Sequence, residues 1–194
     1  MSFSLKDTES ALQDVLRDPY AYRWTASGLG MIRCYLSPDE SLRLHIWNRK
    51  FRAPGASMIH THPWMLQSTV VRGSLKNYVY EETNTPAPGA ANYFRRPMRC
   101  GATAGCAGND ALAQLRLRRI EFYAQDDTYS HRQNEIHETD AADGTVTILR
   151  RTMTTRDYAY IYWPSGTEFG DSYQRPATAH EIDVALNAIA RSMA

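Results

Sequence analysis

The feature that most constrains the fold is a succession of short runs rich in β-branched and aromatic residues, each followed by Gly, Pro, Asn or Asp. Runs of this kind are typical of β-strands bounded by turns. Many strands at short spacing favour a barrel or sandwich over alternating βαβ units. We therefore predict an all-β, mainly antiparallel fold with strands at 31–36, 42–47, 57–62, 67–71, 74–80, 116–123, 134–138, 145–151 and 158–163.

Helical patterns are confined to the two ends of the chain. Residues 4–17 carry a cap candidate, Ser4, and an apolar stripe at helical spacing. Near the other end, Thr178 and Glu181 have the spacing of a capping box ahead of an apolar run. The sequence thus predicts a short N-terminal helix and a C-terminal helix.

Residues 81–113 differ from the strand-rich pattern, because they are rich in turn-forming and small residues. We interpret them as an insertion between two barrel strands. Cys100 and Cys106 lie in it, but their spacing does not match a CxxC motif, so we expect two loop thiols. A lid, an interface element and a decoration all remain open as roles for this insertion.

Length and charge narrow the class of protein. The 194 residues fit one domain, 1–194, and the net charge of +1 gives no electrostatic case for binding nucleic acid or an anionic membrane. The first residues do not form a signal sequence, and no apolar run has the length of a membrane span. Three cysteines, an odd number, argue against a disulfide scaffold. We expect a cytoplasmic protein.

The most informative stretch holds two histidines at positions i and i+2. In a strand, His60 and His62 would project from one face, close enough to share an ion. Gly55 precedes the pair and Gly73 follows the next predicted strand, and both suit turns. Such a pair alone is weak evidence for a metal site, so the surrounding spacing decides its meaning.

Gly55, His60, His62, Gln67 and Gly73 together resemble the first motif of the cupins. His137 resembles the histidine of the second motif, although the proline and glycine of that motif are absent. The resemblance covers roughly residues 30–165. It implies a cupin-type double-stranded β-helix barrel, or jelly roll, with one divalent metal ion on His60, His62 and His137.

Gln67 stands where many cupins have a glutamate ligand, so Gln67 and Glu135 are the candidates for a fourth ligand. A three-histidine set without glutamate is similar to that of the thiol dioxygenases, such as cysteine dioxygenase. In that family an upstream arginine binds the substrate carboxylate, and Arg33 stands at nearly the matching distance before His60. The alternative is that Arg33 forms a surface ion pair. The Ser-His-Tyr set of that family is absent here, so the resemblance does not imply cysteine as the substrate.

Our leading hypothesis is a mononuclear non-haem Fe(II) dioxygenase acting with O2 on a small carboxylate- or thiol-bearing molecule. Tyr129 and His131 are candidates for the rim of its pocket, where they could move protons. Two alternatives stay open: a Zn, Ni or Mn ion acting as a Lewis acid in an isomerase, lyase or hydrolase, and a non-catalytic ligand-binding protein. The sequence does not decide whether the protein is a homodimer.

Overall fold

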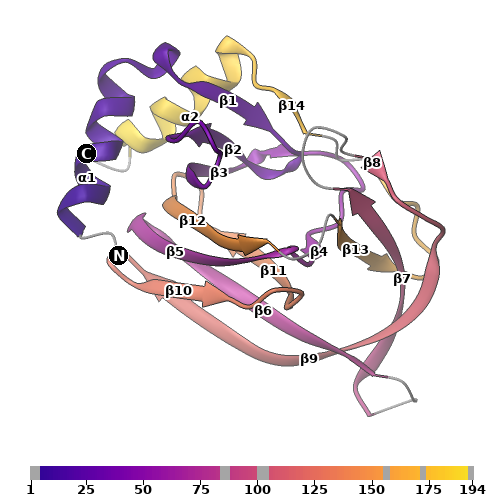
Figure 1. The fold of residues 1–194 in the computed structure, drawn as a ribbon. Coiled ribbons are helices and arrows are strands. Elements are labelled where there is room, and N and C mark those ends of the chain that lie inside the picture. Colours follow the sequence, from indigo (N-terminus) through magenta and orange to yellow (C-terminus); the bar gives the residue numbers. More distant parts are fainter. Residues whose placement is uncertain (1–4, 84–87, 100–104, 155–157, 171–173, 192–194) are drawn as a thin grey trace.

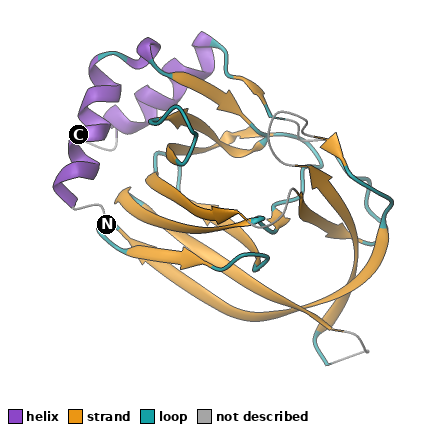
Figure 2. Ribbon diagram, viewed as in Figure 1, coloured by secondary structure: helices purple, strands orange, loops and turns teal. Residues whose placement is uncertain are grey.

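Two antiparallel β-sheets face each other, and two helices cover the outer side of the first sheet (Figures 1 and 2). The structure is a computed structural model that describes residues 5–83, 88–99, 105–154, 158–170 and 174–191. The helices are α1 (Leu5–Arg17) and α2 (Ala179–Arg191), with a 3₁₀ turn, η1 (Pro19–Ala21), after α1. Neither α-helix is long and apolar enough to cross a membrane.

The strands of both sheets pair in the antiparallel sense wherever they are described. The first sheet has the order β10 (Thr128–His131), β5 (Trp64–Arg72), β12 (Val146–Thr154), β3 (Leu42–Arg52), β2 (Leu29–Tyr35), β1 (Arg23–Ala26) and β14 (Arg175–Pro176). The second has the order β13 (Tyr158–Pro164), β4 (Ile59–His60), β11 (Ile136–Ala141), β6 (Ser74–Thr83), β9 (Ala111–Ala124), β7 (Ala90–Arg99) and β8 (Gly105–Cys106). Because β13 also pairs with β7, six strands of the second sheet close into a barrel.

The alternation of side chains along β3 explains how the layers form. Leu44 and Ile46 point outward and pack with residues of α1 and α2. Trp47 has the opposite orientation and belongs to a second cluster, which receives residues from both sheets. Residues of the closed barrel such as Leu115 and Tyr162 form a third cluster, which is the apolar core of that barrel. The space between the two sheets is thus lined by one face of each.

Strands are found at all nine predicted positions, and both terminal helices are present. The capping box is confirmed: the Glu181 N–H donates to Thr178 Oγ1 at 3.2 Å, and the Thr178 N–H donates to the Glu181 carboxylate at 2.8 Å. The strand predicted at 57–62 is shorter than expected, because β4 holds only Ile59 and His60. Pro63, which lacks an N–H for a ladder, stands three residues after His60.

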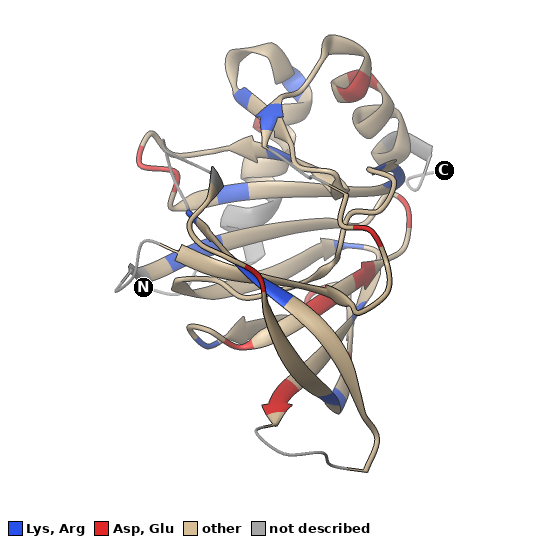
Figure 3. Cartoon of the chain, turned by 90° about the vertical axis from the view of Figure 1, so that its right-hand side faces the viewer, with Lys and Arg blue, Asp and Glu red and all other residues tan. Residues whose placement is uncertain are grey.

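The prediction that residues 81–113 form a turn-rich insertion is wrong for much of the segment. Strand β7 lies within it, and pairs with both β9 and β13 to close the barrel. Its pattern was hidden by Arg95 and Arg96, which pair with carboxylates of Glu82 and Asp110. Figure 3 shows acidic and basic positions interspersed along the ribbon.

Only one of the two cysteines of this segment lies among the described residues. Cys106 is an exposed free thiol in β8, and its Sγ lies 2.8 Å from the Gly108 carbonyl oxygen. Cys100 lies outside the described residues. The expected pair of loop thiols is therefore described for one member only.

Candidate metal centre

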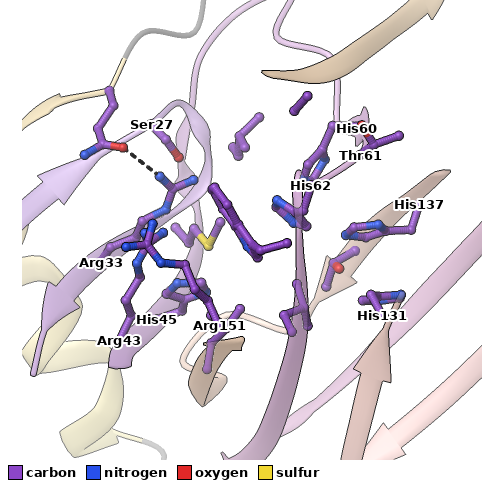
Figure 4. A pocket seen from close by; sticks show the side chains of 18 of the residues that line it. Ser27, Arg33, Arg43, His45, His60, Thr61, His62, His131, His137 and Arg151 are labelled. Atoms are coloured by element: carbon purple, nitrogen blue, oxygen red, sulfur yellow. Dashed lines mark hydrogen bonds between the residues drawn. The ribbon is translucent and has the colours of Figure 1, made fainter. Parts of the chain in front are cut away.

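Three histidines converge on the face of the second sheet that is turned toward the first sheet. His60 ends β4 and lies directly opposite His137 of β11 in the ladder, while His62 follows two residues after His60. The ring centroids are 4.7 Å apart for His60 and His62, 4.7 Å for His60 and His137, and 5.1 Å for His62 and His137. One ligand nitrogen from each ring lies within 4.8 Å of the others, and Figure 4 shows the three rings together.

Backbone carbonyls orient two of these rings. His60 Nδ1 lies 2.7 Å from the Met58 carbonyl oxygen, and His137 Nδ1 lies 3.1 Å from that of Glu135. Because a carbonyl oxygen only accepts, each Nδ1 must carry the proton, which leaves the Nε2 lone pair for a ligand. This hydrogen bond to the second ring nitrogen is the one that metal-binding histidines ordinarily make.

The surroundings keep the imidazoles uncharged at neutral pH. Burial lowers the pKa of His60 to about 4, and the charge of Arg33 acts in the same direction. Burial also holds the pKa values of His62 and His137 well below the ordinary range, with further lowering from the neighbouring imidazoles. Neutral imidazole is the form that binds a metal ion.

These observations meet the requirements of a metal site. The three nitrogens are close together, neutral and, for His60 and His137, correctly oriented. All three side chains line a cavity of about 440 Å³ between the two sheets, so a bound ion would keep open positions toward it. The group could therefore hold a divalent metal ion, and imidazole donors suit Fe, Ni, Cu and Zn alike.

The structure supports neither candidate for a fourth ligand. Gln67 is exposed on β5, between Leu66 and Ser68, which are buried, so its side chain points away from the cavity. Alternation along the strand accounts for this orientation. The Glu135 carboxylate is bonded elsewhere: it accepts from Arg119 Nη2 at 2.8 Å and from His131 Nδ1 at 2.9 Å. These bonds, chiefly the one from His131, lower the pKa of Glu135 to about 2.

His131 lies beside the metal-binding group rather than on a pocket rim. It is buried in β10, and its ring stacks on that of His137 at 3.9 Å between centroids and 11° between planes. Its Nδ1–H donates to Glu135, and its Nε2 accepts from the Asn77 amide at 3.1 Å. The Asn77 amide oxygen in turn accepts from Thr139 Oγ1 at 2.7 Å. Both nitrogens of His131 are thus engaged, and its ring is held in place.

Two aromatic side chains complete this end of the cavity. Tyr129 is buried, lines the cavity and stacks on Tyr123 at 4.7 Å between ring centroids. Burial raises the pKa of Tyr129 to about 12, so it is a neutral phenol at pH 7. Trp64 stacks on His62 at 5.4 Å between centroids, with an interplanar angle of 19°. Sequence analysis placed Tyr129 and His131 at the rim of the pocket; both line it, but both are buried.

Arginines occupy the opposite wall, as Figure 4 shows. Arg33 of β2 lines the cavity, and its Nη1 donates to the Gln174 amide oxygen at 3.1 Å. Arg43, Arg151 and His45 lie on the same wall, and sequence analysis did not single out any of them as a site residue. The alternation that puts Trp47 between the sheets also puts Arg43 and His45 there, but this follows only once the facing side of the strand is known.

Comparison with known proteins adds no assignment: no protein-family model matches the chain, and no curated protein matches it. An antiparallel β fold with a closed barrel and a three-histidine group is compatible with a cupin.

Proposed function

We propose that this chain is a cupin-type jelly-roll protein and a mononuclear non-haem Fe(II) dioxygenase for a small molecule bearing a carboxylate or a thiol. The observation that carries this proposal is the pairing of three neutral imidazoles with an arginine across one cavity. Three neutral ligands leave the ion its full charge and open positions for O2 and for a chelating substrate group.

The residues of the chain would divide the work as follows. His60, His62 and His137 would hold the ion, which supplies the redox chemistry when it is bound. The planar guanidinium of Arg33 would bind the substrate carboxylate through paired hydrogen bonds and so fix its orientation. A volume of about 440 Å³ suits a small molecule.

Apolar side chains on the cavity walls would exclude water from the reacting groups. Trp47, Leu66 and Leu149 contribute from the first sheet, and Ile161 contributes from the second. Tyr129, with its neutral phenol in the cavity, is our candidate for holding a proton near the substrate. We assign His131 a positioning role, because its two nitrogens are bonded to Glu135 and Asn77 while its ring supports His137.

The test uses untagged protein, stripped of metal and reloaded with Fe(II) or Zn(II) without oxygen. Oxygen uptake is then followed with a panel of small thiol acids and carboxylic acids. We expect uptake matched to substrate loss with Fe(II) only, and its loss in His60→Ala and His137→Ala. His180→Ala is the control, since His180 is exposed at the start of α2.

Two results would contradict the proposal. Turnover of a substrate under nitrogen, or equally well with Zn(II), would instead indicate a Lewis-acid isomerase, lyase or hydrolase. A protein that binds no metal after reloading would remove the basis of both reactions.

A further inference from the structure

The cavity carries an excess of positive charge. The described residues that line the cavity include five arginines, and among them Glu40 is the single carboxylate. The chain as a whole is almost balanced, with 22 basic and 21 acidic residues, so composition does not explain the excess. Charge of one sign inside a partly enclosed cavity favours a ligand of the opposite sign.

Three of these arginines come from neighbouring strands. Arg33 lies on β2, Arg43 on β3 and Arg151 on β12, and these strands are adjacent in the first sheet. The register places Arg43 opposite Leu149, two residues before Arg151 along β12. Figure 4 shows the three guanidiniums gathered on one side of the cavity, facing the histidines.

The partners of Arg43 and Arg151 do not balance their charge. Arg43 Nε donates to the Glu40 backbone oxygen at 3.0 Å, and its Nη2 lies 3.6 Å from the Glu40 carboxylate. That carboxylate also pairs with Arg23. Arg151 Nη2 donates to the Asp39 backbone oxygen, a neutral acceptor, at 2.7 Å. Arg43 therefore shares one carboxylate with Arg23, while Arg151 is bonded to a neutral oxygen.

Buried Arg43 responds to this imbalance. Its side chain is only 8% exposed. Burial and the charges of Arg33 and Arg151 lower the pKa of Arg43 to about 10. The guanidinium remains charged at pH 7, and an anion placed between Arg43 and Arg151 would relieve the repulsion.

Two buried polar atoms on the same cavity point to a ligand independently of the arginines. His45 Nε2 and Ser27 Oγ are buried and have no hydrogen-bond partner among the described residues. Both side chains line the cavity, and His45 lies opposite Arg33 in the ladder. Leaving such groups unpaired is costly, and both can donate to an oxygen acceptor of a ligand, His45 in the tautomer that carries its proton on Nε2.

We propose that the substrate carries a second negatively charged oxygen group, bound by Arg43 and Arg151 beside the carboxylate at Arg33. The second group is a carboxylate or a phosphate, since both accept paired hydrogen bonds from guanidinium groups. The proposal deepens the proposed function and takes from it only the carboxylate at Arg33. Binding at the arginine wall itself requires no metal ion.

The test measures binding of three probes to metal-free protein by calorimetry at constant ionic strength: acetate, succinate and inorganic phosphate. We expect succinate or phosphate to bind at least about tenfold more tightly than acetate. Preference for succinate identifies a dicarboxylate substrate, and preference for phosphate identifies a phosphorylated one. Equal affinity for all three probes would overturn the proposal.

Variants locate the binding site. Arg43→Gln and Arg151→Gln should each abolish the preference for the divalent probe while leaving acetate affinity within about twofold. The control is Arg116→Gln, whose arginine pairs with Glu81 on the exposed surface of β9. A similar loss in the control would contradict the assignment. If Arg43→Gln does not fold, Arg151→Gln decides alone, because Arg151 is less buried.

The same experiment separates this inference from the proposed function. Tight binding of a divalent anion by a protein that takes up no metal would leave the arginine site standing and remove the oxygenase. Metal uptake without preference for divalent anions would do the reverse.

Discussion

The metal-free protein should lose stability when the pH is lowered from 7 to 5. His60 has a folded-state pKa of about 4, against an ordinary value near 6.5 in the unfolded chain. Between these values the unfolded state binds more protons, so the free energy of unfolding falls as the pH falls. For His60 alone, the difference between pH 7 and pH 5 is about 2 kcal/mol.

Most other titratable groups with shifted pKa values either titrate outside the range from pH 5 to pH 7 or, like His60, destabilise the fold as the pH falls. His45, His62 and His137 also have lowered pKa values, so each adds to the loss. The carboxyl groups with lowered pKa, such as Glu135 at about 2, lose their stabilising charge only at lower pH. Glu138, whose burial raises its pKa, offsets part of the effect.

The measurement is urea denaturation at pH 7, 6 and 5 in a chelator, followed by tryptophan fluorescence. His60→Gln should reduce the drop in the free energy of unfolding by about 2 kcal/mol. His180→Gln, at an exposed position of α2, should leave the drop unchanged. A free energy that is flat between pH 7 and 5, or an identical drop in His60→Gln, would refute the reasoning.

Three further predictions follow from the same structure. Metal binding at pH 6 should release far fewer protons than the roughly two expected of three ordinary histidines. Calorimetry in buffers of different ionisation enthalpy measures this number. Release of two or more protons would contradict the lowered pKa values. Gln67→Ala should leave metal affinity within about twofold in a competition titration, since the side chain is exposed, and a tenfold loss would restore it as a ligand. Gly73→Ala should destabilise the fold by about 2 kcal/mol in a thermal melt, because Gly73 has φ of +80° and a new Cβ would lie 2.6 Å from Thr145 Oγ1. Gly166→Ala is the control, since Gly166 has φ of +89° but open space around it, and it should destabilise the fold less. Equal losses of stability would show that the contact with Thr145 is unimportant.

The fold was predictable where local pattern and burial agree. Runs such as 42–47 alternate or are continuously apolar, because one face or both faces of each strand are covered. Strand β7 escaped prediction because Arg95, Arg96 and Pro97 interrupt its pattern, and the two arginine charges are paired with Glu82 of β6 and with Asp110, which directly precedes β9. Pairing with β13 is a property of the whole chain and leaves no local signal.

The candidate site was predictable to the same limit. Spacing placed His60 and His62 on one face, and the resemblance made them candidate ligands and added His137, which the ladder places opposite His60. The resemblance also suggested Gln67, but the period of the strand directs its side chain outward. The arginine wall depends on which strands become neighbours, so Arg43 and Arg151 acquired meaning only from the register.

The most direct test of the account is X-ray absorption spectroscopy on untagged, reloaded protein together with elemental analysis. The account predicts one divalent ion per chain, with three imidazole nitrogens at roughly 2.0–2.2 Å, and loss of the ion in His137→Ala. Retention of a full complement of metal in His137→Ala, or a coordination shell without imidazole, would contradict it.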